Sequence, residues 1–347
     1  MVKEKTRSSG RAAQLPNVPK PRTRRRNPGP SQQPAVVAAG AKSPSLDRRK
    51  RLAASTRRPS DSNSLALARS LADRRSANCR IRKSFARRSD AQEPKPWLAQ
   101  LVGPESGRAA EPRLKIVLTL LYLANDDIWS VTNADAASWA LLLGLDDPQR
   151  QGAKRVSAAV RWLHEQRFIE ADRRQGRPPK MRIMHESGNG RWTSPTGRQG
   201  VRQTEADKYS QLDRGFWAHG WITVLSARAI AALVIVLDAT WGLNTATTAT
   251  RKTRGGLKFE ETRALPWWHI TEQRLVENYG VSRDLFDRGV KELEEWGLLE
   301  TQKRKKRDSA VWDEKRWFRE LRVRIETLQF PVERIEAGDT PQYRQPP

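Results

Sequence analysis

Residues 280–300 read GVSRDLFDRGVKELEEWGLLE, and this pattern of residue types also occurs 130 positions earlier in the chain. At that offset six residues fall on residues of the same type: Val160 on Val290, Leu163 on Leu293, Glu165 on Glu295, Phe168 on Leu298, Ile169 on Leu299 and Glu170 on Glu300. The agreement predicts a structural repeat. In each copy a helix is expected to lead directly into a strand.

Around the first copy, the spacing of apolar residues predicts three helices and then a hairpin. The helices begin near Glu111, after the N-cap Asn133 and near Gln149, and the strands are RFIEAD (167–172) and KMRIM (180–184). Gly144 stands where a left-handed residue ends the second helix. The adjacent prolines 178 and 179 exclude helix between the two strands, so a turn is expected there.

The same order of elements is predicted around the second copy. A first helix follows its N-cap Ser226, and a second helix follows Thr271 and ends at Gly280. Apolar and charged residues alternate over 321–326, which predicts the strand that returns from the hairpin. Three helices followed by a hairpin is the order of a winged helix, so two such units are expected.

Positive charge gathers on one side of each third helix and at each hairpin tip. On the helices the residues are Lys154, Arg155, Ser157 and Arg161, and then Ser282, Arg283, Arg288 and Lys291. At the tips they are Arg173, Arg174, Arg177 and Lys180, and then Lys303, Arg304, Lys305, Lys306 and Arg307. Asp284 and Asp287 lie near the second set, so the second copy is expected to bind phosphate weakly or to serve dimerisation.

Residues 280–300 resemble the helix-turn-helix core of bacterial winged-helix regulators, where Gly-Val-Ser-Arg opens the recognition helix and Gly-Leu-Leu-Glu enters the wing. The stretch FWAHGWITVLSARAIAALVIVL (216–237) resembles the start of the winged domains of plasmid and phage replication initiators. These resemblances imply a recognition helix in the major groove, read by the polar residues named above, and a wing against backbone or minor groove. The first copy departs from the pattern, because DDPQRQGAKR (146–155) lengthens its turn by six residues.

A second resemblance concerns the first hairpin tip. Gly176-Arg177-Pro178 is similar to the core of an AT-hook, an extended segment that lies in a narrow A/T minor groove. The resemblance implies that this tip contacts DNA, whereas the alternative is a polar turn that only maintains solubility.

The formal net charge of +26 lies mainly in the first part of the chain. Residues 1–95 hold 25 Lys and Arg against 6 Asp and Glu, and the other 252 residues hold 40 against 33. Such a segment buries little and is expected to be disordered. It gains most by displacing counterions from a polyanion, for which nucleic acid is the expected candidate and an anionic membrane surface is the rival. An alternative for residues 64–88 is a basic amphipathic helix on a phosphate backbone.

The fold class expected from these patterns is mainly α with small β-hairpin wings (α+β). Its parts are a disordered basic arm over 1–96, a first winged-helix domain over 111–186, a linker over 187–212, a second winged-helix domain over 213–330 and a C-terminal tail over 331–347. The longest apolar stretch, 229–237, is far shorter than the ~20 residues of a membrane span, and the first thirty residues hold no apolar run of signal-peptide length. No membrane partner is therefore expected.

The sequence gives little indication of a catalytic site or a metal site. The single Cys79 excludes an internal disulfide and fits a reducing cytoplasm, and the four histidines show no paired spacing, so neither metal nor cofactor is expected. HEQR (164–167) with Tyr209 has the spacing of a tyrosine recombinase fragment but lacks its arginine context. Glu292, Glu294 and Glu295 are interpreted as a solvated helix face. The thirteen tryptophans are assigned to packing, with base stacking around 312–317 as the rival.

The resulting hypothesis is a cytoplasmic, nucleoid-associated bacterial protein that binds double-stranded DNA and is not an enzyme. Its expected role is replication initiation for a plasmid or mobile element. A transcriptional regulator is the first alternative, and an RNA-binding or ribonucleoprotein factor is the second. A homodimer, and contacts with a replisome or RNA polymerase, stay open as partners.

Overall fold

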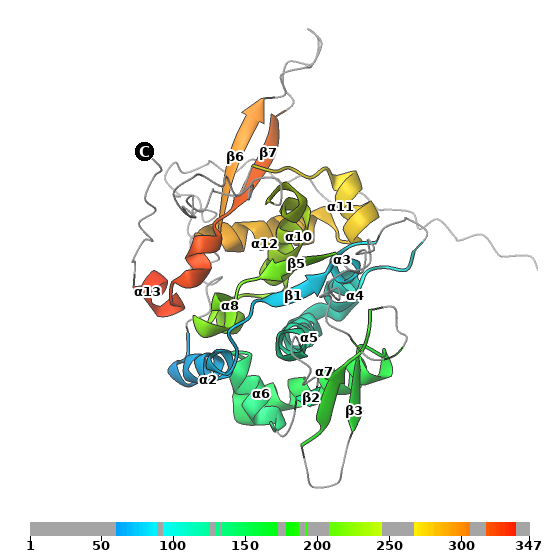
Figure 1. Ribbon diagram of the computed structural model, residues 1–347, viewed down its shortest axis with the longest axis vertical. Helices are drawn as coiled ribbons and strands as arrows, with labels where there is room; N and C mark the ends of the chain where they lie inside the picture. The colour runs from blue at the N-terminus through cyan, green and yellow to red at the C-terminus, as the bar shows by residue number, and fades with distance from the viewer. Residues whose placement is uncertain are drawn as a thin grey trace, which may run out of the picture. The chain divides into compact units, whose positions relative to one another are not determined.

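The computed structural model describes residues 60–88, 93–124, 130–131, 134–172, 178–186, 190, 192, 208–244, 267–305 and 317–337 (Figure 1). These residues are mainly helical and carry small antiparallel sheets, which confirms the α+β class. The helices are α2 (Ser62–Asp73), α3 (Lys83–Ala86), α4 (Trp97–Val102), α5 (Ala110–Ala124), α6 (Ala136–Leu142), α7 (Ala153–Glu165), α8 (Gly215–Ala218), α9 (Trp221–Val224), α10 (Ala227–Asn244), α11 (Glu272–Tyr279), α12 (Arg283–Glu295) and α13 (Val332–Glu336). The strands are β1 (Cys79–Arg82), β2 (Ser130–Val131), β3 (Ile169–Asp172), β4 (Lys180–Ile183), β5 (Tyr209–Leu212), β6 (Leu299–Lys305) and β7 (Trp317–Val323).

The three helices and the hairpin predicted in the first half are α5, α6, α7 and the pair β3–β4. Asp135 is the N-cap of α6, because its carboxylate accepts a hydrogen bond from the amide of Ser138 at 2.7 Å. The predicted cap, Asn133, lies outside the described residues. The hydrogen bonds from Ser138 also lower the pKa of Asp135, since they favour the ionised carboxylate.

The second half repeats this order with α10, α11, α12 and the hairpin β6–β7. The predicted caps are present: the hydroxyl of Ser226 accepts from the amide of Ala229, and that of Thr271 accepts from the amide of Arg274. Each hydroxyl satisfies an amide that has no partner within its helix.

Each half also contains one extended segment that the sequence did not predict. In the first half β2 pairs with β4, which gives the sheet order β2-β4-β3. In the second half Trp268 forms the corresponding bridge to Leu321, on β7. Segments of one or two residues are too short to show an alternating period, so the hydrophobic pattern could not reveal them.

The helix-to-strand corner follows the repeat closely. Helices α7 and α12 begin and end at the same offset of 130 residues, and so do the first residues of β3 and β6. At the corner the amide of Phe168 donates to the carbonyl of Leu163, and the amide of Leu298 donates to that of Leu293, both at 2.9 Å. The apolar members of the predicted pairs are buried in both halves. The predicted repeat is therefore confirmed as a local structure.

The disordered arm expected over 1–96 needs correction at its inner end. Helix α2 begins after Asp61, whose carboxylate accepts from the amide of Ser64, and its face of Leu65, Ala68 and Ala72 is buried. Strand β1 then pairs antiparallel with β5. A continuous basic helix over 64–88 is therefore wrong. The small apolar residues at helical spacing pack against α8 and α6 instead of exposing a phosphate-binding face.

The linker and the tail expected from the sequence also contribute to the fold. Strand β5 lies within the expected linker 187–212. In the expected tail 331–347, Val332 is fully buried at the start of α13, and Glu333 pairs with Arg69 of α2 at 2.5 Å. The described residues between 60 and 337 group as one compact unit, and the buried apolar residues of both halves form one continuous core.

Two glycine turns bring the halves into close contact. Gly144 and Gly280 each follow the second helix of their half with φ values of +64° and +63°. A Cβ added at Gly144 would lie 2.3 Å from the carbonyl oxygen of Thr223, which belongs to the second half. A Cβ at Gly280 would lie 3.1 Å from the Cβ of Ala99, which precedes the first half.

Alanine substitutions at Gly144 and Gly280 can be compared directly, because the two glycines have nearly equal positive φ values and the backbone strain should be the same at both. Gly280→Ala should lower the free energy of unfolding by about 1–2 kcal/mol, because an L-residue is strained at positive φ. Gly144→Ala should lower it by roughly 3 kcal/mol or more, because the methyl group also meets backbone that cannot yield. Urea unfolding followed by circular dichroism measures both losses. Equal losses would contradict the closer approach at Gly144.

Candidate nucleic-acid interface

The outer face of α7 carries a cluster of exposed cationic and polar side chains. Val156, Ala159, Val160 and Leu163 point into the core, and Lys154, Ser157 and Arg161 on the other side are exposed. With Arg150, from the π-helical turn before α7, these three polar residues line a shallow cavity of about 590 Å³. The structure therefore brings together three of the four residues predicted on this helix.

No carboxylate lines the cavity on this face, although Glu165, one turn after Arg161 on α7, is also exposed. The cavity is lined by Gln149, Arg150, Gln151, Ala153, Lys154, Ser157, Ala158 and Arg161. Within the described part of the chain, neither Lys154 nor Arg161 forms an ion pair. Arg150 was not predicted from the sequence, although it lies in the insertion 146–155, because that segment was interpreted only as a longer turn.

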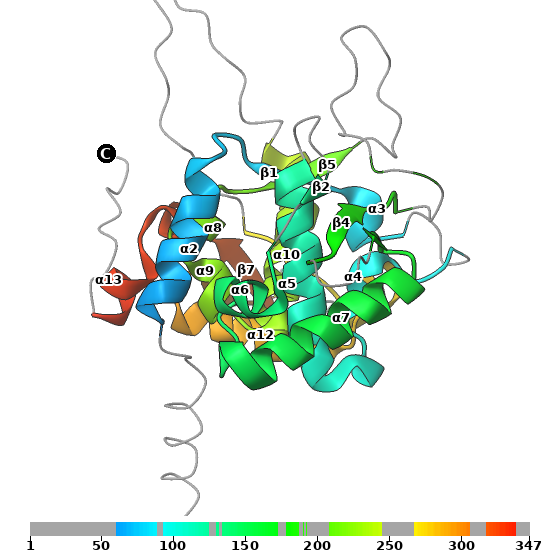
Figure 2. The same ribbon diagram turned by 90° about the horizontal axis from the view of Figure 1, so that it is seen from below.

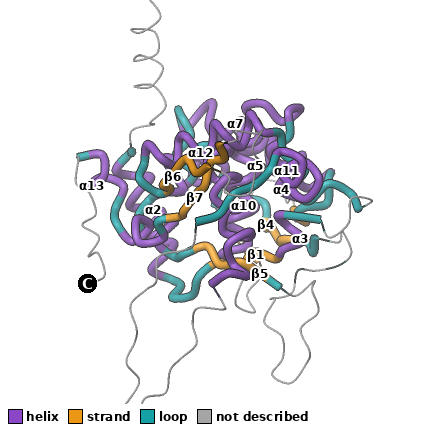
Figure 3. The backbone as a smooth tube through the Cα atoms, turned by 90° about the horizontal axis from the view of Figure 1, so that it is seen from above, coloured by secondary structure: helices purple, strands orange, loops and turns teal. Residues whose placement is uncertain are grey.

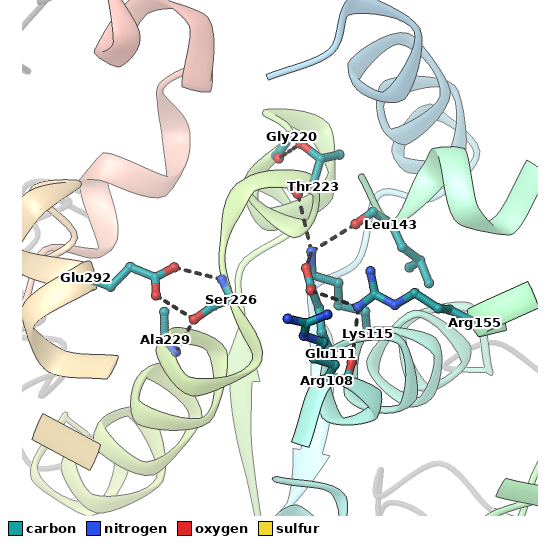
Figure 4. A network of polar contacts seen from close by, with 10 residues as sticks. All are labelled: Arg108, Glu111, Lys115, Leu143, Arg155, Gly220, Thr223, Ser226, Ala229 and Glu292. Atoms are coloured by element: carbon teal, nitrogen blue, oxygen red, sulfur yellow. Dashed lines mark hydrogen bonds and ion pairs between the residues drawn. The ribbon is translucent and has the colours of Figure 1, made fainter. Parts of the chain in front are cut away.

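Arg155 has a different environment from the other three. Its guanidinium donates to the carbonyl of Arg108 at 3.1 Å and to Glu111 at 3.4 Å (Figure 4). Glu111 also accepts from the fully buried ammonium of Lys115 at 3.0 Å. Arg155 thus supports the packing of α7 against α5, and its side chain is half-buried.

The outer face of α12 carries as many cations, but each has an acidic partner. Three pairs follow helical spacing: Arg283 with Asp287 at 2.8 Å, Arg288 with Asp284 at 2.9 Å and Lys291 with Glu295 at 3.9 Å. Arg283 also donates to the carbonyl of Ile270. Ser282 is the N-cap of α12, since its hydroxyl accepts from the amide of Leu285. The face is therefore close to neutral, as the sequence anticipated from Asp284 and Asp287.

The inner face of α12 is fixed by a buried carboxylate. Glu292 accepts from the amide of Ser226 at 2.8 Å and from its hydroxyl (Figure 4). Burial raises the pKa of Glu292, and the hydrogen bonds from Ser226 offset part of this rise. The expectation that Glu292 lies on a solvated face is therefore wrong. Its carboxylate instead joins α12 to the start of α10.

The two hairpins that the sequence predicted as wings are described only in part. Arg173, Arg174 and Arg177 of the first tip, and Lys306 and Arg307 of the second, lie outside the described residues, as does the side chain of Lys305. Lys180 is half-buried on β4, opposite Asp172. On β6, Lys303 is exposed, and Arg304 pairs with Glu320 at 3.2 Å.

A second, larger groove joins the two helices. Its volume is about 960 Å³, and its lining includes Arg155 of α7 and Arg288 of α12. The carboxylates of Glu111, Asp146 and Asp284 also line it, so its charge is mixed. Arg108 and Arg228, which precede or begin the first helix of each half, also border it. Figure 2 and Figure 3 show α7 and α12 along the same side of the body, and Figure 1 shows the hairpins β3–β4 and β6–β7 towards opposite ends.

The histidines, the cysteine and Tyr209 occupy local structural roles. His164 accepts from the amide of Ala171 at 3.2 Å, and Arg80 lies over the ring of Tyr209. Burial lowers the pKa of His219 and raises that of Cys79. Among the described residues no group of three or more His, Cys, Asp and Glu is placed to hold a metal ion.

The described tryptophans belong mainly to the core. The buried ones are Trp97, Trp139, Trp192, Trp217, Trp221 and Trp296. Trp162, Trp267 and Trp268 are half-buried, and Arg113 lies 3.8 Å from the ring centre of Trp162. Packing is thus confirmed for the buried rings, and the side chains of Trp312 and Trp317 lie outside the described part.

The chain matches no protein-family model, no curated protein and no solved structure. In the described part of the chain, every helix is too short or too polar to cross a lipid bilayer.

The buried carboxylate of Glu292 predicts a pH effect on stability. Its pKa is raised in the folded state, so the neutral form is favoured, and its stabilising contribution is lost as pH rises through the folded pKa. Glu292→Gln cannot ionise and keeps one acceptor. Its urea midpoint relative to the wild-type protein should therefore increase as pH rises from about 4 towards neutrality. Glu295→Gln, which removes the ion pair with Lys291 near the end of the same helix, is the control. A difference that does not vary with pH would argue against ionisation of a buried carboxyl.

Proposed function

We propose that this chain binds duplex DNA through two winged-helix halves, with α7 as the principal reading helix. The order helix, strand, helix, helix, strand, strand occurs twice, and in each half the short first strand pairs with the last one. This is the order of a winged helix, in which the third helix enters the major groove.

The observation that carries the proposal is the exposed cationic face of α7. Lys154, Arg161 and Arg150 present positive charge without a carboxylate in the cavity that they line. Contact with phosphates releases condensed counterions, so such a surface gains affinity for DNA in a salt-dependent way. Ser157 and Arg161 can hydrogen-bond base edges, and arginine is the usual bidentate partner of guanine.

Helix α12 fits a second, weaker contact. Its most exposed pair is Arg288 with Asp284, whose side chains are 60% and 70% accessible. Exposed pairs contribute only about 0–1 kcal/mol, so phosphate can compete for the same arginine. The carboxylates that remain nearby nevertheless reduce the attraction of this face for DNA.

Within DNA binding, the role that we propose is replication initiation for a plasmid or mobile element. Two non-identical winged halves in one chain, together with the resemblance of residues 216–237 to initiator domains, favour this role over transcriptional regulation. Supplying the gene in trans to a plasmid that carries a neighbouring origin tests the proposal. If no such origin replicates, while binding near a promoter alters transcription, the regulator becomes the better assignment.

Binding itself is tested by salt titration of the full chain on a selected duplex. Arg161→Ala should weaken binding about 5- to 150-fold on the preferred site and change base preference, as expected for loss of a contact worth about 1–3 kcal/mol. Lys154→Ala should weaken binding to all sequences and reduce the slope of log K against log salt by about 1. Arg74→Ala removes an exposed arginine next to the end of α2 and serves as the matched control.

Competition with structured RNA completes this test. A preference for duplex DNA that depends on Arg161 supports the proposal. A preference for RNA, or variants of Lys154 and Arg161 that bind like Arg74→Ala, would overturn it.

A further inference from the structure

The short segments that precede the two halves make comparable contacts, each with its own half and with the opposite one. Each half is preceded by a short helical lead-in that starts with tryptophan, Trp97 in α4 and Trp221 in α9. Trp97 packs on Phe168 with ring centres 4.6 Å apart, and Trp221 packs on Trp296 at 5.7 Å. In both cases the partner ring lies at the corner between the third helix and the wing of the same half.

Two residues further along, each lead-in crosses to the opposite half. Ala99 lies against the turn at Gly280, and Thr223 lies against the turn at Gly144. The first lead-in therefore contacts the helix-turn-helix of the second half, and the second lead-in contacts that of the first. Contacts that are repeated with the partners exchanged are the mark of a two-fold interface.

The strands before the lead-ins agree with this relation. β1 precedes α3 and α4, β5 precedes α8 and α9, and the two strands pair antiparallel with Cys79 opposite Leu212 and Arg82 opposite Tyr209. An antiparallel pair brings equivalent strands together in opposite directions, as a two-fold axis requires. The groove between α7 and α12 also draws on both halves, because both contribute arginines and carboxylates to it. The arginines are Arg108, Arg155, Arg228 and Arg288, and the carboxylates are Glu111, Asp146 and Asp284.

We infer that the two winged-helix halves of one chain are related by an internal two-fold axis, like the subunits of a dimer. We infer from this that one chain recognises an imperfect inverted repeat in duplex DNA. α7 reads one half-site and α12 reads the other, because protein two-fold symmetry is matched by symmetry in the operator. Arg108 and Arg228, at the groove between the helices, lie against the phosphates of the central step. This inference rests on the proposed function and adds the symmetry of its target.

The half-sites are unequal because the helices are. The α7 face carries cations without carboxylates in its cavity, whereas the cations of α12 are paired with Asp284, Asp287 and Glu295. The half-site under α7 therefore contributes most of the affinity. The half-site under α12 contributes mainly to discrimination between DNA sequences. The exchanged contacts are already made within one chain, so no second copy is needed to complete the two-fold site.

Selection from random duplexes with the full chain tests the inference. The selected sites should contain two related half-sites in inverted orientation, bound by one chain as measured by mass photometry. Reversing one half-site should weaken binding at least about tenfold, since each mismatched base pair typically costs 1–3 kcal/mol. Arg161→Ala should relax selection in one half-site only, and Arg288→Ala should relax it in the other only.

The outcomes separate this inference from the function on which it rests. Direct repeats, two chains on each inverted repeat, or a single half-site altered by both variants would overturn the internal two-fold reading and leave duplex binding intact. Absence of any selected duplex, with Arg74→Ala indistinguishable from Arg161→Ala, would overturn both.

Discussion

The ammonium group of Lys115 holds the two halves together. It is fully buried on α5, and besides Glu111 it donates to the carbonyl of Leu143 at 2.9 Å and to that of Thr223 at 3.3 Å. The first carbonyl belongs to the end of α6, and the second belongs to the lead-in of the other half. A buried charge without partners costs several kcal/mol, so these contacts must stay formed for the body to remain folded. Together with the continuous apolar core, this group fixes the position of the two halves relative to each other.

The role of Lys115 could not be predicted from the sequence. Lys115 lies within an apolar run and resembles any charged residue on an amphipathic helix, because its partners are distant carbonyls. By contrast, the caps Ser226 and Thr271, the turn at Gly280 and the offset of 130 residues depend on local chemistry and were predictable. The role of residues 60–88 was missed because their arginines dominated the composition, whereas Ala68 and Ala72 decide the packing.

The candidate interface was predicted unevenly for a similar reason. Helical spacing placed Lys154, Ser157 and Arg161 correctly on one face. Spacing alone cannot show that Arg155 turns towards Glu111, or that Glu292 is drawn into the core by Ser226. Arg108 and Arg228 precede or begin helices far apart in the sequence, so only the fold brings them to one groove.

The close seating of Thr223 on Gly144 has a mechanical consequence. With a backbone oxygen where a methyl group would collide, and a buried ammonium beside it, the two halves cannot hinge apart without breaking both contacts. If α7 and α12 read DNA as proposed, this rigid pair cannot adjust its span to the helical repeat of the target. Sequences whose middle base steps deform easily would then be favoured even where no side chain touches them.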